Sequence, residues 1–408
     1  MTKHIVVLGA GFAGLWTAIG AMRKIVEAKA QDGIEVTAVN RAPYHNIRVR
    51  NYEADLSEVC VPLNDVLTPI GVDIVLGEAT AIDLAKRTVS VASAAGARVL
   101  HYDRLALATG SAIVRPPIPG FAEYGFDVDT YEAAAKLDDH LKRLAARPAA
   151  SGRFTVVVVG AGLTGIETAT AMPERLAAIR ADAPSAEPAR VIVIDRLPFV
   201  GSDMGPHARP AIEEALARLG IEQRVGAEIV RIEASGVRLK SGERIDAATV
   251  IWCGGMRASP LAAMLPGVHD ARGRIAVDEY LRVAGVEGVY AAGDVASLLI
   301  DGEHASVMSC QHGRPMGRFA GHNIAADLLG APLLPLRVDW YTTILDLGPS
   351  GAVYTKGWDR RVIATGAAAK ATKRTINGKR IYPPRTRNAA DILAAAAPIV
   401  QKPPEIGG

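Results

Sequence analysis

Cysteines, aromatic residues and long apolar runs are all scarce in this 408-residue sequence. The three cysteines, at positions 60, 253 and 310, lie far apart and form no CxxC pair, which argues against a zinc site and a disulfide framework. The apolar stretch at 392–400 is well short of the roughly 20 residues that a membrane-spanning helix needs. We therefore predict no metal site and no membrane-crossing helix.

The overall composition is typical of a soluble globular protein. Hydrophobic residues make up 49% of the chain and charged residues 22%, which leaves enough apolar surface for large cores. A chain of this length fits two or three domains. A predicted strand begins by His4, so a cleavable signal peptide would remove the first element of the fold. We therefore expect the protein in the cytoplasm.

The net charge of +3 is unevenly distributed along the chain. From Gly351 to the end there are eleven Lys and Arg residues against three acids, so this region carries +8 and the rest of the chain −5. Such a region predicts contact with lipid headgroups or an acidic partner, and the alternative is a solvated hairpin face. No aromatic-basic platform accompanies the charge, so we expect no nucleic-acid partner.

Two glycine-rich turns, each between an apolar strand and an apolar helix, stand out in the sequence. They read IVVLGAGFAG at 5–14 and VVVVGAGLTGIET at 156–168. In such turns the glycines permit a tight bend and a close approach of pyrophosphate, while the helix N-terminus faces the phosphates. Each turn therefore predicts a dinucleotide site, and packing alone is the alternative. The expected binding residues are Gly9, Gly11, Phe12, Ala13 and Gly14 in the first turn and Gly160, Gly162, Leu163, Thr164 and Gly165 in the second.

The residue at the end of the following strand distinguishes the two sites. Asp195 can accept a hydrogen bond from a ribose 2′-OH and would repel a 2′-phosphate, so the second site favours NADH. Arg196 follows directly and leaves NADPH open. Asn40, the equivalent residue in the first unit, suits the adenosine ribose of FAD. Ordinary capping of the strand end is the alternative for both side chains.

Two later motifs complete the first site. The ATG at 108–110 contributes Thr109 and Gly110, and the Gly-Asp of AAGDVA contributes Gly293 and Asp294, whose carboxylate can bind the ribityl hydroxyls of FAD. The predicted fold class is α/β, with two Rossmann-like dinucleotide-binding domains and a small β-rich C-terminal domain. The NAD domain interrupts the FAD domain. The expected boundaries are 1–117 and 273–332 for the FAD domain, 118–272 for the NAD(P)H domain and 333–408 for the C-terminal domain.

The order of these motifs resembles that of the two-dinucleotide FAD/NAD(P) flavoproteins. Within them the chain is most similar to the type II NADH dehydrogenases, the NADH:quinone oxidoreductases. NRAPYH at 40–45 resembles a family motif and adds Arg41 and His45 to the expected FAD residues, and IWCGGMRASP adds Gly254 to the nucleotide site. The resemblance covers about residues 1–330 and implies hydride transfer from NADH to FAD and then electron transfer to a quinone.

The sequence departs from that family near the expected quinone site. Asn40 replaces the usual acid, NIRVRNYEADL after His45 is more basic than the family pattern, and Ser306-Val307 replaces Ala-Gln. Gln311 still matches a family glutamine. The identity of the acceptor is what these changes leave open.

Three residues are the candidates for catalysis. We place Glu167 in the first turn of the helix after the second fingerprint, where it either complements the helix dipole or, as the resemblance implies, lies beside the flavin and nicotinamide rings. Gln311 and His312 begin a late helix whose N-terminus would face the flavin, and His312 is either a proton donor or a structural residue. Cys310 beside them leaves sulfide oxidation as an alternative.

Two further functions stay open at this stage. One is a soluble NAD(P)H-dependent reductase of diaphorase or ferredoxin-reductase type, which passes electrons to a protein carrier or small molecule. The other is a flavin- and NADH-binding sensor without turnover. The C-terminal region would form a peripheral contact with the anionic inner face of the membrane, or a homodimer contact.

Overall fold

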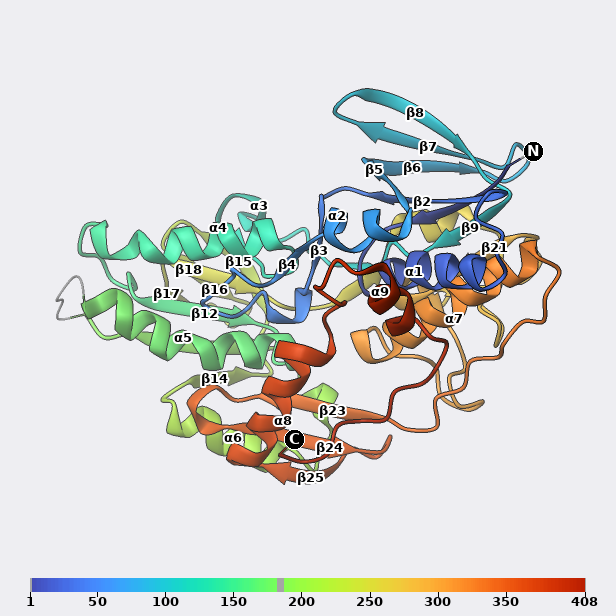
Figure 1. Ribbon diagram of the computed structural model, residues 1–408. Helices are drawn as coiled ribbons and strands as arrows, with labels where there is room; N and C mark the ends of the chain where they lie inside the picture. The colour runs from blue at the N-terminus through green and yellow to red at the C-terminus, as the bar shows by residue number, and fades with distance from the viewer. Residues whose placement is uncertain (1, 182–186, 408) are drawn as a thin grey trace.

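Two parallel five-stranded sheets form the cores of the protein, whose computed structural model describes residues 2–181 and 187–407 (Figure 1). The first sheet consists, in spatial order, of β21 (Val289–Ala291), β9 (Arg104–Leu107), β1 (Lys3–Leu8), β2 (Ile34–Asn40) and β5 (Asp73–Leu76). The second consists of β11 (Gly125–Phe126), β18 (Thr249–Trp252), β12 (Thr155–Val159), β13 (Arg190–Asp195) and β14 (Glu222–Val225). All neighbouring strands within each sheet run parallel.

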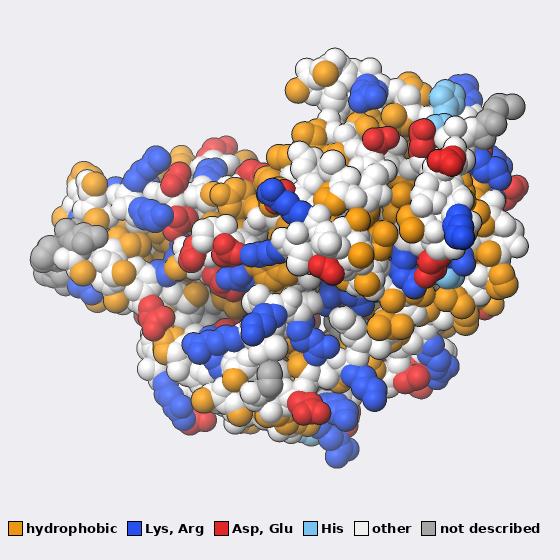
Figure 2. Space-filling model, viewed as in Figure 1, with side chains coloured by type: hydrophobic (Ala, Val, Ile, Leu, Met, Phe, Trp, Pro, Cys, Tyr) orange, Lys and Arg blue, Asp and Glu red, His pale blue; other side chains and the backbone are white. Residues whose placement is uncertain are grey.

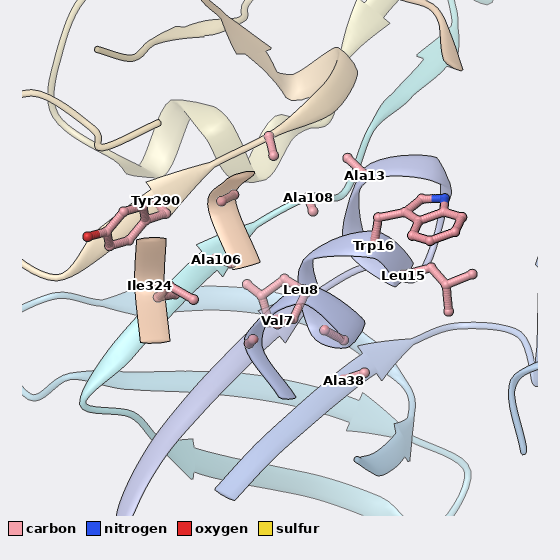
Figure 3. Close-up of a cluster of buried hydrophobic side chains, with 14 of the residues drawn as sticks. Val7, Leu8, Ala13, Leu15, Trp16, Ala38, Ala106, Ala108, Tyr290 and Ile324 are labelled. Atoms are coloured by element: carbon pink, nitrogen blue, oxygen red, sulfur yellow. The ribbon is translucent and has the colours of Figure 1, made fainter. Parts of the chain in front are cut away.

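Continuous apolar runs explain why the central strands are buried. Residues 5–8 of β1 are at most 2% exposed, and residues 156–159 of β12 are at most 8% exposed. A strand that is apolar on both faces must be covered on both, which is the usual situation in parallel sheets. Figure 3 shows Val7 and Leu8 of β1 beside Ala106 of β9 and close to Ile324, where the first core lies.

Helices follow the strands in the order that the two fingerprints predict. The longer ones are α1 (Phe12–Glu27), α4 (Tyr131–Lys142), α5 (Leu163–Ala181), α6 (Arg209–Arg218) and α7 (Cys310–Leu328), and the short ones are α2 (Leu63–Val66) and α3 (Phe121–Tyr124). None of the helices within the described ranges combines the length and the apolar character needed to cross a bilayer.

Glycines bring α1 and α7 into close contact. A Cβ on Gly317 would lie 2.3 Å from the Ala13 carbonyl oxygen, and a Cβ on Gly321 would lie 2.3 Å from that of Thr17. The two helices therefore run side by side in the same direction, and only glycine fits where their backbones approach. This packing places the start of α7 beside the first fingerprint.

Smaller antiparallel sheets complete the two nucleotide-binding regions. Those of the first region are β3 (Tyr44–Asn46) with β4 (Cys60–Pro62), and β6 (Glu78–Asp83) with β7 (Thr88–Ser93) and β8 (Gly96–His101). The second region has β15 (Ile229–Glu233), β16 (Gly236–Leu239) and β17 (Arg244–Asp246). Two further pairs are the antiparallel β10 (Ser111–Ile113) with β19 (Met256–Ala258) and the parallel β20 (Ile275–Ala276) with β22 (Ala296–Ser297). The β10–β19 pair joins a segment before the second fingerprint to one after it.

The C-terminal region combines a sheet with helices. Strands β23 (Thr342–Asp346), β24 (Ala352–Lys356) and β25 (Arg361–Thr365) form the antiparallel sheet that the Gly- and Pro-containing turns predict. They are followed by α8 (Gly366–Thr375), the π-helical turn η8 (Ile376–Arg380) and α9 (Ala389–Ala395). Figure 1 shows this last segment leaving the C-terminal sheet and reaching α1, where Ile392 joins the first core. The chain end thus packs against its beginning.

The two parallel sheets, each with a fingerprint turn after its central strand, confirm the predicted α/β fold class with two Rossmann-like units. The boundaries proposed for the individual domains stay a prediction.

Candidate functional site

The first fingerprint turn is tight at its outer glycines and open at its middle one. A Cβ on Gly14 would lie 1.9 Å from the Gly9 carbonyl oxygen, and one on Gly9 (φ +95°) would lie 2.5 Å from that of Ala108. A Cβ on Gly11 would meet nothing within 4 Å. The middle glycine is the position at which pyrophosphate approaches the backbone of such turns. The free space therefore lies where a bound dinucleotide would need it.

The second turn has the same backbone but is covered. A Cβ on Gly165 would lie 1.7 Å from the Gly160 carbonyl oxygen, and a Cβ on Gly160 would lie 3.1 Å from Gly254. At the middle glycine, Gly162, a Cβ would lie 2.7 Å from the Asp203 carboxylate oxygen Oδ2. A carboxylate therefore occupies the space that pyrophosphate would enter.

The two strand-end residues make the same contact in both units. Asn40 Oδ1 accepts a hydrogen bond from the Ala10 amide at 2.9 Å, and Asp195 Oδ2 accepts one from the Ala161 amide at 2.6 Å. Asp195 Oδ1 also accepts from the Leu197 amide at 2.8 Å. Capping of the turn is thus present in both cases, and contact with a ribose stays a prediction. Arg41 is exposed and lies 3.9 Å from Glu78.

His45 supports the first turn from the other side. Its Nδ1 lies 2.9 Å from the Ala10 carbonyl oxygen, and its ring meets the Phe12 ring edge-on at 5.0 Å between centroids. Burial lowers the pKa of His45 to about 4, so the ring is neutral at neutral pH and Nδ1 carries the proton that Ala10 accepts. The Nε2 atom is buried and has no protein partner.

The predicted flavin motifs meet at this turn. Gly9 lies against Thr109, Gly293 lies against Ala13, and Gly313 of α7 lies against both Gly293 and Phe12. Three polar atoms of these segments, Thr109 Oγ1, His45 Nε2 and Ser309 Oγ, are buried without a partner. Buried polar atoms of this kind need a hydrogen-bonding group. Their position around an open glycine turn fits a flavin nucleotide.

Asp294 belongs to a cluster that the sequence motifs only partly predict. Its Oδ2 accepts from the Ser111 hydroxyl at 2.7 Å, and Arg48 Nη1 lies 3.9 Å away. Arg48 also pairs with Asp129, which lies in the segment before α4. Burial raises the pKa of Asp294, and the Ser111 hydroxyl and Arg48 partly oppose that shift. Arg48 lies in the stretch that departs from the family pattern, and that departure was the one signal for it.

Glu167 is not where the sequence analysis places it. Helix α5 begins at Leu163, so Glu167 lies in the second turn, and no acidic residue occupies the first. The prediction of a first-turn residue that complements the helix dipole is therefore wrong. The helix already begins at Leu163, directly after Gly162, so its first turn is complete before Glu167. Instead, the Glu167 carboxylate Oε1 lies 2.7 Å from Lys373 Nζ and accepts from the Asp346 amide at 3.1 Å.

Burial governs the protonation of this ion pair. The side chains of Glu167 and Lys373 are each 8% exposed. Burial raises the pKa of Glu167, although the Lys373 ammonium acts in the opposite direction. The carboxylate in turn raises the pKa of Lys373 against the effect of burial. Tyr52 has a raised pKa because of its burial and the nearby carboxylates Glu167 and Asp346. The sequence gives no signal for Lys373, since α8 lies far along the chain.

Gln311 and His312 lie at the start of α7 and contact the C-terminal region. Gln311 Oε1 accepts from the Thr342 hydroxyl of β23 at 3.2 Å. His312 Nδ1 accepts from the Val307 amide at 2.9 Å, and its ring lies near Tyr341 and Trp358. Burial lowers the pKa of His312 to about 4, so the ring is neutral. This geometry favours the structural interpretation, and a role in proton transfer stays a prediction.

Strand β23 connects the candidate catalytic residues. Its first residue, Thr342, contacts Gln311, and its last residue, Asp346, contacts Glu167. Gly254 lies at the second turn, where its carbonyl accepts from Trp252 Nε1 at 2.8 Å. Cys310 has a pKa raised by burial and is thus a thiol, not a thiolate. The C-terminal sheet therefore contacts both nucleotide-binding units at their candidate residues.

Much of the C-terminal positive charge is neutralised within the chain. The ion pairs that do this join Lys373 to Glu167, Lys370 to Asp346, Arg385 to Glu58, and Arg387 to Asp65. Figure 2 still shows Lys and Arg side chains gathered over α8 and its neighbouring elements. The basic region thus has an internal docking role besides any external one.

Comparisons with known proteins agree with this arrangement. The pyridine nucleotide-disulphide oxidoreductase family matches residues 3–317. An NADH dehydrogenase-like protein of Mycobacterium tuberculosis is 56% identical over 405 residues, which cover 99% of this chain and 100% of that protein. A type II NADH:quinone oxidoreductase of Staphylococcus saprophyticus is 26% identical, covering 93% and 95%. The structure of NDH2 from Plasmodium falciparum with NADH has a TM-score of 0.77 at 12% identity, covering 96% and 98%, and so shares the fold.

Proposed function

The chain belongs to the pyridine nucleotide-disulphide oxidoreductase family as a type II NADH dehydrogenase-like flavoenzyme, and on that premise we propose that it uses FAD and NADH to reduce a quinone. The observation that carries this proposal is the pair of dinucleotide turns joined by one strand, β23, which contacts Gln311 on one side and Glu167 on the other. FAD belongs in the first turn, where Gly11 leaves open space and three buried polar atoms lack partners.

NADH belongs in the second turn, at Asp195. A carboxylate at this strand end accepts from a ribose hydroxyl and repels a 2′-phosphate. Each carboxylate oxygen of Asp195 accepts from one backbone amide and keeps a second lone pair that can accept from a ribose hydroxyl. When bound, FAD supplies the chemistry of accepting a hydride and passing on two electrons.

The protein contributes orientation and proton control. The α7 N-terminus presents free backbone amides and a partial positive charge to the flavin site. Glu167 Oε1 and Lys373 Nζ hold a proton between them at 2.7 Å, shielded from bulk water. Quinone reduction consumes two protons along with two electrons, so a buried proton-holding pair at this interface has a direct use.

A Glu167→Gln variant tests this role. It keeps FAD, because Glu167 contacts no residue of the first turn, but it lowers NADH:quinone turnover by about 100-fold, as is typical for loss of a proton-transfer group. The measurement is steady-state NADH oxidation with a panel of uncharged quinones, ferricyanide and oxygen. Glu174→Gln on the exposed side of the same helix is the matched control and keeps wild-type turnover. Unchanged kinetics in Glu167→Gln would remove Glu167 from the mechanism.

A peripheral contact with anionic membranes belongs to the same proposal. The exposed residues Arg374, Lys379 and Lys402 lie in or after α8 and have no carboxylate partner among the ion pairs of the described residues. Replacing all three with Gln leaves the internal ion pairs in place. Flotation with vesicles that contain phosphatidylglycerol should fall for this variant and with added salt. If neither the triple replacement nor added salt reduces flotation, the membrane contact is wrong and the homodimer contact is the remaining role of this region.

A further inference from the structure

Two arginines on α7, the half-buried Arg314 and the buried Arg318, have no negative partner among the residues that the structure describes. Arg314 and Arg318 are four residues apart, so they lie on the same side of the helix. Their guanidinium carbons lie 5.3 and 4.4 Å from the centroid of the Trp16 ring on α1. Arg318 is only 2% exposed. No ion pair found within residues 2–181 and 187–407 includes either arginine, whereas Arg23 on α1 pairs with Glu27.

Unused hydrogen-bond donors gather at the same place. The Nε atoms of Arg314 and Arg318 and the Nε1 of Trp16 are buried without partners. One turn further along α7, His322 Nδ1 is also buried without a partner, and its tautomer decides whether it donates or accepts. Buried polar groups in folded proteins are almost always hydrogen-bonded, and buried charges are almost always paired. Several donors with no acceptor in the described part of the chain therefore point to a group from outside it.

The Trp16 ring alone does not account for these arginines. A cation over an aromatic ring is attracted to its face but keeps its N–H groups unsatisfied. Burial lowers the pKa of Arg314 to about 10, and the nearby Arg380 guanidinium acts in the same direction. Burial and the neighbouring Arg314 lower the pKa of Arg318 to about 9, so both side chains are still cations at neutral pH. Within the described ranges, no carboxylate therefore compensates Arg314 or Arg318.

The arginines lie beside the candidate site, on the side of the C-terminal segment. Arg314 is one helical turn after Cys310 and lies close enough to His45 to affect its pKa. Trp16 belongs to the same buried cluster as Ile381 and Tyr382 of the segment after α8. Figure 3 shows the Trp16 ring on the side of α1 away from Val7 and Leu8, and thus away from the sheet. The NADH turn at Gly162 belongs to the other sheet.

We propose that Arg314 and Arg318 bind an oxyanion group, a carboxylate, sulfonate or phosphate, that is part of the electron acceptor. Guanidinium groups bind such anions through paired, charge-assisted hydrogen bonds, and the Trp16 indole holds both side chains in place. The inference rests on the proposed function and refines it, because it defines the acceptor as an anionic molecule.

The test compares a naphthoquinone sulfonate with the uncharged parent naphthoquinone as acceptors. In the Arg314→Gln and Arg318→Gln variants we expect kcat/KM to fall about ten-fold for the sulfonate and less than two-fold for the parent compound. Arg318→Lys should recover part of the loss. Arg218→Gln on α6, an exposed residue paired with Glu214, is the control and shows no change. Equal losses for both quinones, or no loss, would overturn the proposal.

A second measurement covers variants that fold poorly. Arg318→Met replaces a buried, unpaired cation with an apolar side chain of similar length, so the ligand-free protein should keep or raise its Tm. Inorganic phosphate should raise the Tm of the wild type but not of this variant. A lower Tm in Arg318→Met together with an unchanged response to phosphate would contradict the proposal.

Two controls separate the possible failures. If phosphatidylglycerol vesicles, but not phosphatidylcholine vesicles, bind in an Arg318-dependent manner while sulfonate kinetics do not change, the anion is a lipid headgroup and the acceptor assignment is wrong. Flavin reduction by NADH without any acceptor checks the proposed function separately. If NADH does not reduce the flavin of the wild type, the proposed function is wrong. If NADH reduces the flavin but the arginine variants lose no preference for the sulfonated quinone, only this inference is wrong.

Discussion

The two fingerprint turns share one backbone design but differ in what covers them. In both, the third glycine lies against the carbonyl of the first, and the strand-end side chain accepts from the amide between the first two glycines. Gly11 faces open space, whereas Gly162 faces the Asp203 carboxylate. The comparison shows that local sequence sets the shape of a turn, while distant segments set its accessibility.

The loop that carries Asp203 is held by the C-terminal hairpin. The Arg360 guanidinium donates to the Asp203 carbonyl and to the Thr343 hydroxyl, and it lies 4.5 Å from the centroid of the Tyr341 ring. A dinucleotide that enters the second turn must displace a carboxylate, because two negative groups repel each other there. This asymmetry suits a cofactor that stays in the first site and one that enters and leaves the second.

The largest expected effect comes from Gly14. Its replacement by alanine puts a Cβ 1.9 Å from a backbone oxygen, so the first unit cannot close. We expect a loss of more than about 4 kcal/mol in the free energy of unfolding, seen as little or no folded protein by circular dichroism. Gly11→Ala meets no atom and should fold as well as the wild-type apoprotein. A normal yield of folded Gly14→Ala would contradict the close contact.

Breaking the ion pair between the units should cost somewhat less. Lys373→Met leaves Glu167 buried and uncompensated, which destabilises proteins by about 3–5 kcal/mol. The double variant with Glu167→Gln should be more stable than Lys373→Met alone. Urea unfolding of the wild type, the two single variants and the double variant gives the coupling free energy. Lys240→Met, in an exposed pair with Glu228, is the control, with a loss of at most about 1 kcal/mol. Additive losses would show that the two side chains do not interact.

Acid should weaken both the first turn and its contact with the C-terminal sheet. His45 and His312 have a pKa of about 4 in the folded protein, against roughly 6.5 when unfolded. The unfolded state therefore binds more protons below pH 6.5, and stability falls as the pH drops toward 4. Each buried histidine contributes about 3 kcal/mol to this loss. Thermal melts across this pH range should show that the Tm of His312→Gln depends less on pH than the Tm of the wild type. An equal dependence of Tm on pH in both proteins would contradict the burial of His312.

The smallest expected effect concerns the covered turn itself. Asp203→Asn removes one negative charge beside Gly162, so the KM for NADH should fall about five-fold, as expected for roughly 1 kcal/mol of relieved repulsion. The kcat at saturating NADH should not change. Asp139→Asn on the exposed side of α4 serves as the control. A KM that stays the same in Asp203→Asn would mean that the carboxylate leaves the turn at no cost.

Local patterns predicted the parts of the fold that depend on neighbouring residues. The strand, turn and helix around each fingerprint follow from the valine runs and the glycine spacing, and the proximity of Asn40 and Asp195 to those turns follows from the parallel strand order. The meeting of Thr109 and Gly293 with the first turn also follows from the order of the motifs. These features need only short-range geometry and one sheet topology.

Contacts between distant segments could not be predicted in this way. Lys373 pairs with Glu167 only because α8 packs behind β23, and Asp203 covers Gly162 only because a loop folds back over the turn. Arg314 and Arg318 lie in a helix for which the sequence pointed only to Gln311, His312 and Cys310. No periodicity or motif encodes such pairs, since they depend on how three separate parts of the chain dock.

We infer that the first turn holds a flavin and that the second admits NADH. Anaerobic titration of the purified protein with NADH, followed by visible absorbance, tests it most directly. We expect a yellow wild-type protein that NADH bleaches, a folded but colourless Gly11→Ala variant, and a yellow Gly162→Ala variant that NADH bleaches only at much higher concentration. A colourless wild type that refuses FAD, or a Gly11→Ala variant with a full complement of flavin, would contradict it.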